Sequence, residues 1–236
     1  MKNLFRQVFT YKDSKCTLIA DKQDGIIAAE KSIKHNRIQL ETYIDTNPRF
    51  AWTLVPVHPP EKPLVAKLMA QAAEKANVGP MAAVAGVLAD LAVKEMVTIG
   101  CEVAVVEDGG EISAFSDISI DVAFAAGEEA LSKQFGFRLT QFPIGIATSS
   151  GRFSHALSFG DAEAATVFCR EAGLADAAAT AVGNIVKGED ADAAIEKGIE
   201  ITKSITDVEG ALILFKGCVG TWGKIPQIIR IGSKSK

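Results

Sequence analysis

Paired cysteines, an excess of positive charge and a long apolar run are all missing from this 236-residue sequence. Its four cysteines are far apart and form no C-x-x-C pair, which argues against a structural zinc site or a disulfide scaffold: Cys16, Cys101, Cys169 and Cys218. The net charge is −4, so there is no strong surplus of Lys and Arg to neutralise nucleic-acid phosphates. We therefore expect no nucleic-acid partner.

Segments that would direct the chain into a membrane are also missing. The N-terminal stretch MKNLFRQVFTYKDSK has no apolar core of signal-peptide length. The most apolar helical stretch, VGPMAAVAGVLADLAV, is rich in Ala, contains Asp90 and is too short to span a bilayer. With 48% hydrophobic and 23% charged residues, the composition is that of an ordinary globular protein. We expect a cytoplasmic protein with no membrane partner.

The first half of the chain predicts a hairpin followed by helices. Alternating apolar residues around the KDSK turn predict a β-hairpin over residues 5–20. Asp24 is expected to cap a helix that carries apolar residues at helical spacing as far as Ile44. A proline-rich connection over residues 47–63 leads to a helix that starts near Pro63 and ends near Asn77. A second, Ala-rich helix is expected over residues 79–96.

The second half mixes strands and helices. A hairpin is predicted over residues 103–115, strands over 117–125, 144–149 and 164–169, and helices over 171–186 and 190–205. The last two strands, ALILFK and IPQIIRI, are expected to be separated by the connection GCVGTWGK. Several hairpins among helices predict an α+β fold. We expect one domain over residues 1–236, ending in a flexible tail over residues 232–236.

The stretch IGIATSSGRFSHALSFG, residues 144–160, changes from an apolar run to polar residues where a strand is expected to end. The residues expected at that strand end are Thr148, Ser149, Ser150 and Gly151. Arg152 and His155 follow directly after them. A guanidinium at this place can pair with a phosphate, and an imidazole can accept a proton near neutral pH. The other interpretation is a solvated loop with a lone histidine.

A second stretch, GLADAAATAVGN, places Asp176 and Thr180 four residues apart, on one helix face. A carboxylate and a hydroxyl at this spacing can hold a hard cation such as Mg²⁺ or Ca²⁺ together with backbone carbonyls. The alternative is an ordinary helix start with Asp176 near the positive end of the helix dipole. The spacing alone leaves both interpretations open.

Three weaker signals complete the set. The small residues of VGPMAAVAGVLAD indicate either tight helix packing or the close approach of a ligand. EDGGEI, residues 107–112, is a hairpin turn whose glycine amides could also face an anion. Cys218 lies in a glycine-rich segment and is the cysteine that we would test as a nucleophile.

The four stretches, taken together in their order along the chain, resemble the ApbE superfamily, best known for FAD:protein FMN transferases. They are residues 79–90, 107–112, 144–160 and 173–184. The closest resemblance is to the short ApbE-like proteins of bacteria and archaea. The stretches span Gly79 to Asn184, a little under half of the chain. The resemblance implies an ApbE-like fold in which mixed and antiparallel sheets pack against Ala-rich helices.

The resemblance also implies roles for individual residues. In the transferases an Asp and a Thr of an A-D-x-x-x-T helix hold a metal, and these match Asp176 and Thr180. The carbonyl before that Thr belongs to Ala179, and a further carbonyl comes from the A-K-G motif, which aligns with Val84, Ala85 and Gly86. The implied metal is Mg²⁺ or Ca²⁺.

The remaining matches concern the ligand. The cofactor-binding set implied here is Gly86, Gly109, Gly110, Glu111, Thr148, Ser149, Ser150, Gly151 and Arg152, and the catalytic base is His155. In the family's reaction Mg²⁺ draws charge from the FAD pyrophosphate, a threonine hydroxyl of an acceptor protein attacks the phosphorus on the FMN side, and AMP leaves.

The sequence departs from the family pattern at several positions. The lysine of A-K-G is replaced by Ala85, and Ser158 and Phe159 stand where an acid and a proline are usual. Residues 1–78 show none of the transferases' N-terminal motifs. Three hypotheses follow: a metal-dependent enzyme acting on a flavin or nucleotide pyrophosphate, a binding protein without chemistry, and a cofactor- or sulfur-metabolism enzyme using Cys218. The implied partners are a nucleotide-like small molecule and an acceptor protein, and a homodimer is compatible with all three.

Overall fold

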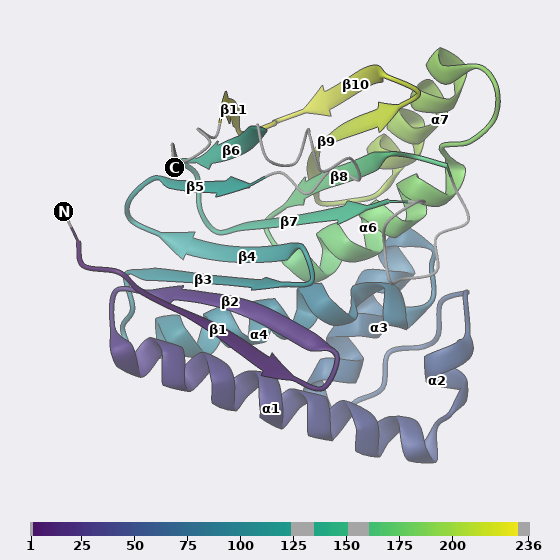
Figure 1. Cartoon of the computed structure of the whole chain (residues 1–236). Helices are drawn as coiled ribbons and strands as arrows, with labels where there is room; N and C mark the ends of the chain where they lie inside the picture. The colour runs from purple at the N-terminus through teal and green to yellow at the C-terminus, as the bar shows by residue number, and fades with distance from the viewer. Residues whose placement is uncertain (1, 124–134, 151–160, 231–236) are drawn as a thin grey trace.

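An eight-stranded antiparallel sheet forms the centre of the molecule (Figure 1). The computed structural model describes residues 2–123, 135–150 and 161–230. The strand order is β1-β2-β3-β4-β7-β8-β9-β10. The strands are β1 (Phe5–Tyr11), β2 (Ser14–Ala20), β3 (Val103–Asp108), β4 (Glu111–Ser116), β7 (Ile144–Ser149), β8 (Ala164–Cys169), β9 (Val208–Phe215) and β10 (Cys218–Gly223).

A smaller sheet packs against one face of the large sheet. Its strands follow the order β11-β6-β5 and are β5 (Ile120–Ala123), β6 (Phe135–Leu139) and β11 (Gln227–Arg230). Phe137 of β6 meets Phe168 of β8 edge to face, with ring centroids 5.1 Å apart. Their neighbours in this buried cluster include Val105, Ile146 and Leu214 of the large sheet.

Helices cover the opposite face of the large sheet. They are α1 (Gln23–Thr46), α3 (Leu64–Ala76), α4 (Val84–Thr98), α6 (Ala172–Ile185) and α7 (Ala191–Ser204), with the short α2 (Arg49–Trp52) and the 3₁₀ turn η1 (Pro80–Ala83). α4 lies on β3 and β4, α6 on β7 and β8, and α7 on β9 and β10, while α1 packs on α4 and on the β1–β2 hairpin. The result is three layers, with the large sheet in the middle.

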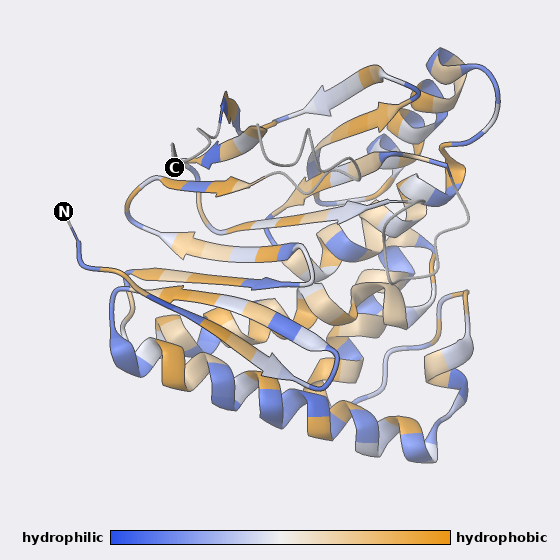
Figure 2. Cartoon of the chain, viewed as in Figure 1, coloured by the Kyte–Doolittle hydropathy of each residue, from blue (hydrophilic) through white to orange (hydrophobic). Residues whose placement is uncertain are grey.

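Burial on both faces explains the apolar character of the central strands. Every residue of β8 is buried, and so is almost every residue of β9. Successive side chains of a strand point to opposite faces, so one half packs on the small sheet and the other half on α6 and α7. Figure 2 shows these strands largely in the hydrophobic colours, whereas α1 alternates between hydrophilic and hydrophobic residues.

The helices α4 and α6 cross at very short distance. A Cβ atom on Gly86 would overlap the carbonyl group of Ala172, and a Cβ on Gly173 would overlap the side chain of Val87. Gly145 of β7 approaches the backbone of Ala172 just as closely. The small residues expected around position 86 therefore serve tight helix packing, one of the two interpretations that the sequence left open.

Most of the expected elements are confirmed, including the α+β class, both hairpins and the helices after Pro63, Gly79, Glu171 and Asp190. The predicted capping of α1 by Asp24 is not confirmed. The helix starts at Gln23 after Lys22, and no side chain caps it. Asp24 lies inside the first turn, where its charge still favours the positive end of the helix.

The prediction that GCVGTWGK is a connection without strand structure is wrong, because residues 218–223 form β10, which pairs with β9. Its glycines suggested a loop, but a Cβ on Gly220 would overlap the side chain of Ile195 on α7. The glycine thus permits helix contact within a strand. β6 and α2 were also missing from the sequence-based expectations. The expected tail, residues 232–236, lies outside the described residues.

In the described part of the chain, no single helix has the length and apolar character needed to cross a membrane. The pair formed by Leu64–Ala76 and Pro80–Thr98 passes the same test only together, and it is bent by 103°.

Candidate functional site

The candidate site lies where the start of α4, the β3–β4 turn and the second turn of α6 come together. α6 contacts α4, η1 and β4, and α4 contacts β3 and β4. These contacts bring Val84, Gly86, Glu111 and Asp176 from three separate parts of the sequence into one region. That these residues together form one binding site stays a prediction.

Asp176 is the central carboxylate of the region. Its Oδ2 accepts a hydrogen bond of 3.1 Å from the backbone N–H of Gly86, at the start of α4. The side chain retains some exposed surface but is enclosed by protein. Burial raises its pKa well above the usual value for Asp, and the charges of Glu111 and Asp108 add to this increase. The protonated form of Asp176 is therefore favoured, and a cation beside the carboxylate would act in the opposite direction.

The two other carboxylates belong to the turn between β3 and β4. Asp108 and Glu111 face each other as the last pair of the hairpin, and Gly109 and Gly110 between them have φ values of 73° and 119°. Left-handed backbone of this kind favours glycine, so the hairpin interpretation of the Asp-Gly-Gly sequence is confirmed. Burial raises the pKa of Glu111 to about 7 and also raises that of Asp108.

Among the described residues, no Lys, Arg or His forms an ion pair with Asp108, Glu111 or Asp176, although the charge of Arg37 acts on Asp108 and opposes the rise of its pKa. Likewise, no group of three His, Cys, Asp or Glu side chains within these residues is arranged to hold one metal ion. A metal would thus have to use Asp176 with uncharged oxygens.

Candidate uncharged oxygens come from the same helix as Asp176 and from the start of α4. Thr180 follows one helical turn later on the same face and is half-buried, and Ala179 is buried beside it. Val84, the first residue of α4, is half-buried two positions before Gly86. A carboxylate, a hydroxyl and backbone carbonyls form a hard donor set that suits Mg²⁺ or Ca²⁺. The residues present therefore fit such an ion.

The end of β7 is placed as the sequence predicts. Thr148 lies on this strand with its hydroxyl 2.8 Å from that of Thr166 on β8, and Ser149 is half-buried at the strand end. Ser150 is buried, and its hydroxyl has no hydrogen-bond partner among the residues that the structure describes. The remaining expected residues of this stretch, Gly151, Arg152 and His155, lie outside the described residues.

Cys16 touches the region, because its thiol shares a hydrogen bond with the Asp108 carboxylate, whereas Cys218 lies elsewhere. Cys218 lies on β10, at the edge of the large sheet, separated from β7 by β8 and β9. Cys16, Cys101 and Cys169 are buried, and burial raises the pKa of each thiol, that of Cys169 to about 12. A raised pKa disfavours the nucleophilic thiolate.

Two carboxylates near the site were not selected from the sequence. Asp108 stands directly before the two glycines, and the hairpin pairing that puts it opposite Glu111 could have been inferred from the turn. Asp90 interrupts an apolar helix, and its oxygens accept hydrogen bonds from the first turn of α6. Only the crossing of the helices reveals that contact.

Comparison with known proteins finds a matching family model and close relatives in sequence. A family model described as AbpE bacteria matches residues 6–209. A UPF0280 protein of Methanococcus vannielii is 39% identical over 98% of this chain and 95% of its own length. A UPF0280 protein of Methanosarcina acetivorans is 38% identical over 95% of this chain and 89% of its own length.

Solved structures share the fold at low sequence identity. The apo form of the flavinyl transferase ApbE from Pseudomonas stutzeri superposes with a TM-score of 0.60 at 14% identity, covering 94% of both chains. The apbe protein of Thermotoga maritima gives a TM-score of 0.60 at 12% identity, covering 97% of both chains. The expected ApbE-like fold is therefore confirmed.

Proposed function

Because this chain belongs to the family described as AbpE bacteria, we propose that it binds a flavin nucleotide, first of all FAD, together with Mg²⁺ or Ca²⁺. The proposed site is the region around Asp176. One observation carries the proposal: Asp176 lies near Glu111 and Asp108, and burial raises the pKa of all three carboxyl groups. A divalent cation would compensate the negative charge of Glu111 and Asp176, with which no described Lys, Arg or His forms an ion pair.

The chain's own residues have distinct roles in this proposal. Asp176, the Thr180 hydroxyl and the carbonyls of Val84 and Ala179 would hold the cation, whose charge would draw electron density from the pyrophosphate oxygens. Gly86 orients the Asp176 carboxylate through its N–H. This geometry leaves Asp176 directed at the place where α4 begins.

The hairpin turn and the end of β7 would contribute to binding the ligand. A Cβ at Gly110 would meet no described atom within 4 Å, so the turn is open on that side. The hydroxyl of Ser150 has no hydrogen-bond partner among the described residues and could donate to a ligand oxygen. A buried hydroxyl without a partner lowers the stability of the folded state, so such a ligand contact would be favourable. The ligand-binding set that we propose also includes Thr148 and Ser149, and, as predictions from the sequence alone, Gly151 and Arg152, which lie outside the described residues.

The solved flavinyl transferase of Pseudomonas stutzeri supports flavin as the ligand class. Transfer of FMN to an acceptor protein would in addition require a base, and we assign this role to His155, whose imidazole can take a hydroxyl proton near neutral pH. A cytoplasmic location and a homodimeric assembly remain predictions.

A second candidate function is binding without transfer. Ala85 carries only a methyl group where the transferases have a lysine, so a cation that would face the phosphates is missing from this position. The cofactor- or sulfur-metabolism alternative has less support, since Cys218 lies on β10, away from the candidate site.

Thermal denaturation with ligands tests the proposal. A ligand that binds only the folded state at a hundredfold excess over its dissociation constant stabilises it by about 2.7 kcal/mol. For a chain of this length that corresponds to a rise in Tm of roughly 5–10 °C. We expect this rise with FAD and Mg²⁺ and a much smaller one with FAD and EDTA. Mg²⁺ alone is the control.

The proposal fails if saturating FAD, FMN and ADP all leave Tm unchanged in the presence of Mg²⁺. Single-turnover assays with FAD then separate the two candidates, because release of AMP with labelled protein requires transfer, whereas a binding protein releases none.

A further inference from the structure

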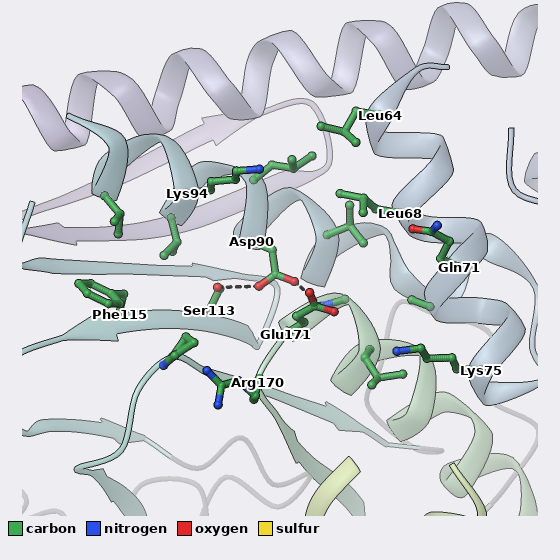
Figure 3. Close-up of a pocket in the computed structure, with 18 of the residues that line it drawn as sticks. Leu64, Leu68, Gln71, Lys75, Asp90, Lys94, Ser113, Phe115, Arg170 and Glu171 are labelled. Atoms are coloured by element: carbon green, nitrogen blue, oxygen red, sulfur yellow. Dashed lines mark hydrogen bonds between the residues drawn. The ribbon is translucent and has the colours of Figure 1, made fainter. Parts of the chain in front are cut away.

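Asp90 of α4 holds the first turn of α6 (Figure 3). Its Oδ1 accepts hydrogen bonds from the Ser113 hydroxyl at 2.7 Å and from the Ala172 N–H at 2.9 Å. Its Oδ2 accepts one from the Gly173 N–H at 2.8 Å. The two amides belong to the first turn of α6, which has no intrahelical partners for them. Asp90 therefore caps a helix to which it does not belong.

The contact is reciprocated one helical turn away. Asp176 of α6 accepts the Gly86 N–H at the start of α4, so each helix gives a carboxylate to the other helix's first turn. Gly86 permits this because any larger side chain would overlap the carbonyl of Ala172. Two carboxylates and a glycine thus fix the separation of the two helices at their crossing.

Asp90 itself faces a different part of the molecule from the candidate site. It borders a cleft of about 800 Å³ whose lining includes Leu68, Lys94, Phe115 and Arg170. Figure 3 shows its carboxylate directed at Ser113 and at the start of α6. Its hydrogen-bond donors are the Ser113 hydroxyl and two backbone amides of α6, so Asp90 acts on the packing of the two helices.

We infer that Asp90 is a positioning residue: by holding the start of α6 against α4, it keeps the Asp176 carboxylate in register with Gly86 and with the carbonyl of Val84. This inference rests on the proposed function where it concerns cation binding. Its other consequence, the hydrogen bond between Gly86 and Asp176, is independent of any ligand.

Two variants separate positioning from general stabilisation. Asp90→Asn keeps the size of the side chain but removes the negative charge and one acceptor, so an α6 amide loses its partner. Ser113→Ala removes a hydrogen bond of the same carboxylate from the β4 side and leaves both amide contacts in place. Both variants are expected to lower stability.

Only Asp90→Asn should change the site. We expect hydrogen exchange of the Gly86 amide, followed by NMR, to accelerate by about tenfold, and Mg²⁺ affinity measured by calorimetry to fall by about tenfold. Ser113→Ala should leave both quantities near the wild-type values. Measurements are made well below the melting temperature of each variant, so that global unfolding does not contribute.

The inference is overturned if folded Asp90→Asn keeps wild-type Gly86 exchange and Mg²⁺ affinity, or if Ser113→Ala changes both to the same extent. If the wild-type protein does not bind Mg²⁺, the metal part of the proposed function fails, and exchange at Gly86 alone decides the inference. Should Asp90→Asn not fold, Asp90→Ser, which retains a helix-capping acceptor, is judged by the same two readouts.

Discussion

The backbone N–H of Gly86 donates a 3.1 Å hydrogen bond to Oδ2 of Asp176, a residue ninety positions further along the chain. The bond joins the start of α4 to the second turn of α6 and orients the carboxylate that we assign to the cation. It also means that changes at either residue act on both the packing and the proposed site.

Replacing Asp176 by Asn tests the cation ligand. The amide keeps the shape but loses the charge that a hard cation requires, so Mg²⁺ affinity should fall by at least about tenfold while the fold survives. Isothermal titration calorimetry measures the affinity and circular dichroism the fold. Asp192→Asn, an exposed change in the first turn of α7, is the matched control. Unchanged affinity in Asp176→Asn would rule out the assignment.

Gly86→Ala tests the helix crossing. The added methyl would overlap the Ala172 carbonyl, so the helices must separate, and overpacking of this kind costs roughly 1–3 kcal/mol of unfolding free energy. Urea denaturation measures the loss. Ala85→Gly is the control at the adjacent position, with a cost of about 1 kcal/mol from helix propensity alone. A Gly86→Ala protein as stable as the wild type would contradict the close approach.

Local patterns in the sequence were enough for many elements. The Asp-Gly-Gly turn, the alternation in β1 and β2, and the alanines of α6 each depend on neighbours within a few residues, and each is confirmed. β10 was missed because Gly220 looks like a loop residue when its contact with Ile195 is unknown. Such a contact involves an element distant in the sequence.

Part of the candidate site can likewise be predicted from local sequence, and part of it depends on the fold. The spacing of Asp176 and Thr180 is visible in the sequence, since both lie on one helix face. The approach of Asp108 and Glu111 to Asp176 is not, because it requires β4 to lie beside α6. Asp90 looked like a lone charge in an apolar helix, and its amide partners become apparent only from the fold.

The stability of the metal-free protein should decrease as the pH rises through neutrality. Burial raises the pKa of Glu111 to about 7 in the folded state, above its ordinary value of 4.5, so the folded protein binds this proton more tightly than the unfolded chain. The resulting stability is fully present below about pH 4.5 and is lost as the pH rises towards 7. Asp176 shifts in the same direction.

Glu111→Gln isolates this effect, because glutamine cannot ionise. In the presence of EDTA, Tm of the wild type should fall by several degrees more than Tm of Glu111→Gln between pH 5 and pH 8. Saturating Mg²⁺ should reduce the difference, since the cation compensates the negative charge. Parallel curves for the two proteins in EDTA would show that Glu111 does not titrate as the geometry requires.

His155→Ala tests the assigned base. If His155 takes the proton of the acceptor hydroxyl, the variant should lose roughly 10²–10⁴-fold in turnover with little change in FAD affinity. A variant that loses affinity but not rate would make His155 a binding residue. Wild-type protein that binds FAD and releases no AMP would favour the binding function instead.

Ala85→Lys tests what the missing lysine costs. Ala85 lies in the first turn of α4, next to Gly86, and is half-buried. A lysine there would add a cation facing the proposed phosphate position, and a hydrogen bond to a charged group contributes about 1.5–3 kcal/mol. After a small loss from placing a cation at a helix N-terminus, FAD affinity should rise by about tenfold.

Ala85→Gln separates charge from size, because glutamine is nearly as long and carries no charge. The gain should appear only with lysine and should shrink as the salt concentration is raised, since ions screen a charge pair that remains partly exposed. Fluorescence titration with FAD at two salt concentrations measures both effects. An equal gain in both variants would mean that length fills the pocket, and no gain in either would place the phosphates away from position 85.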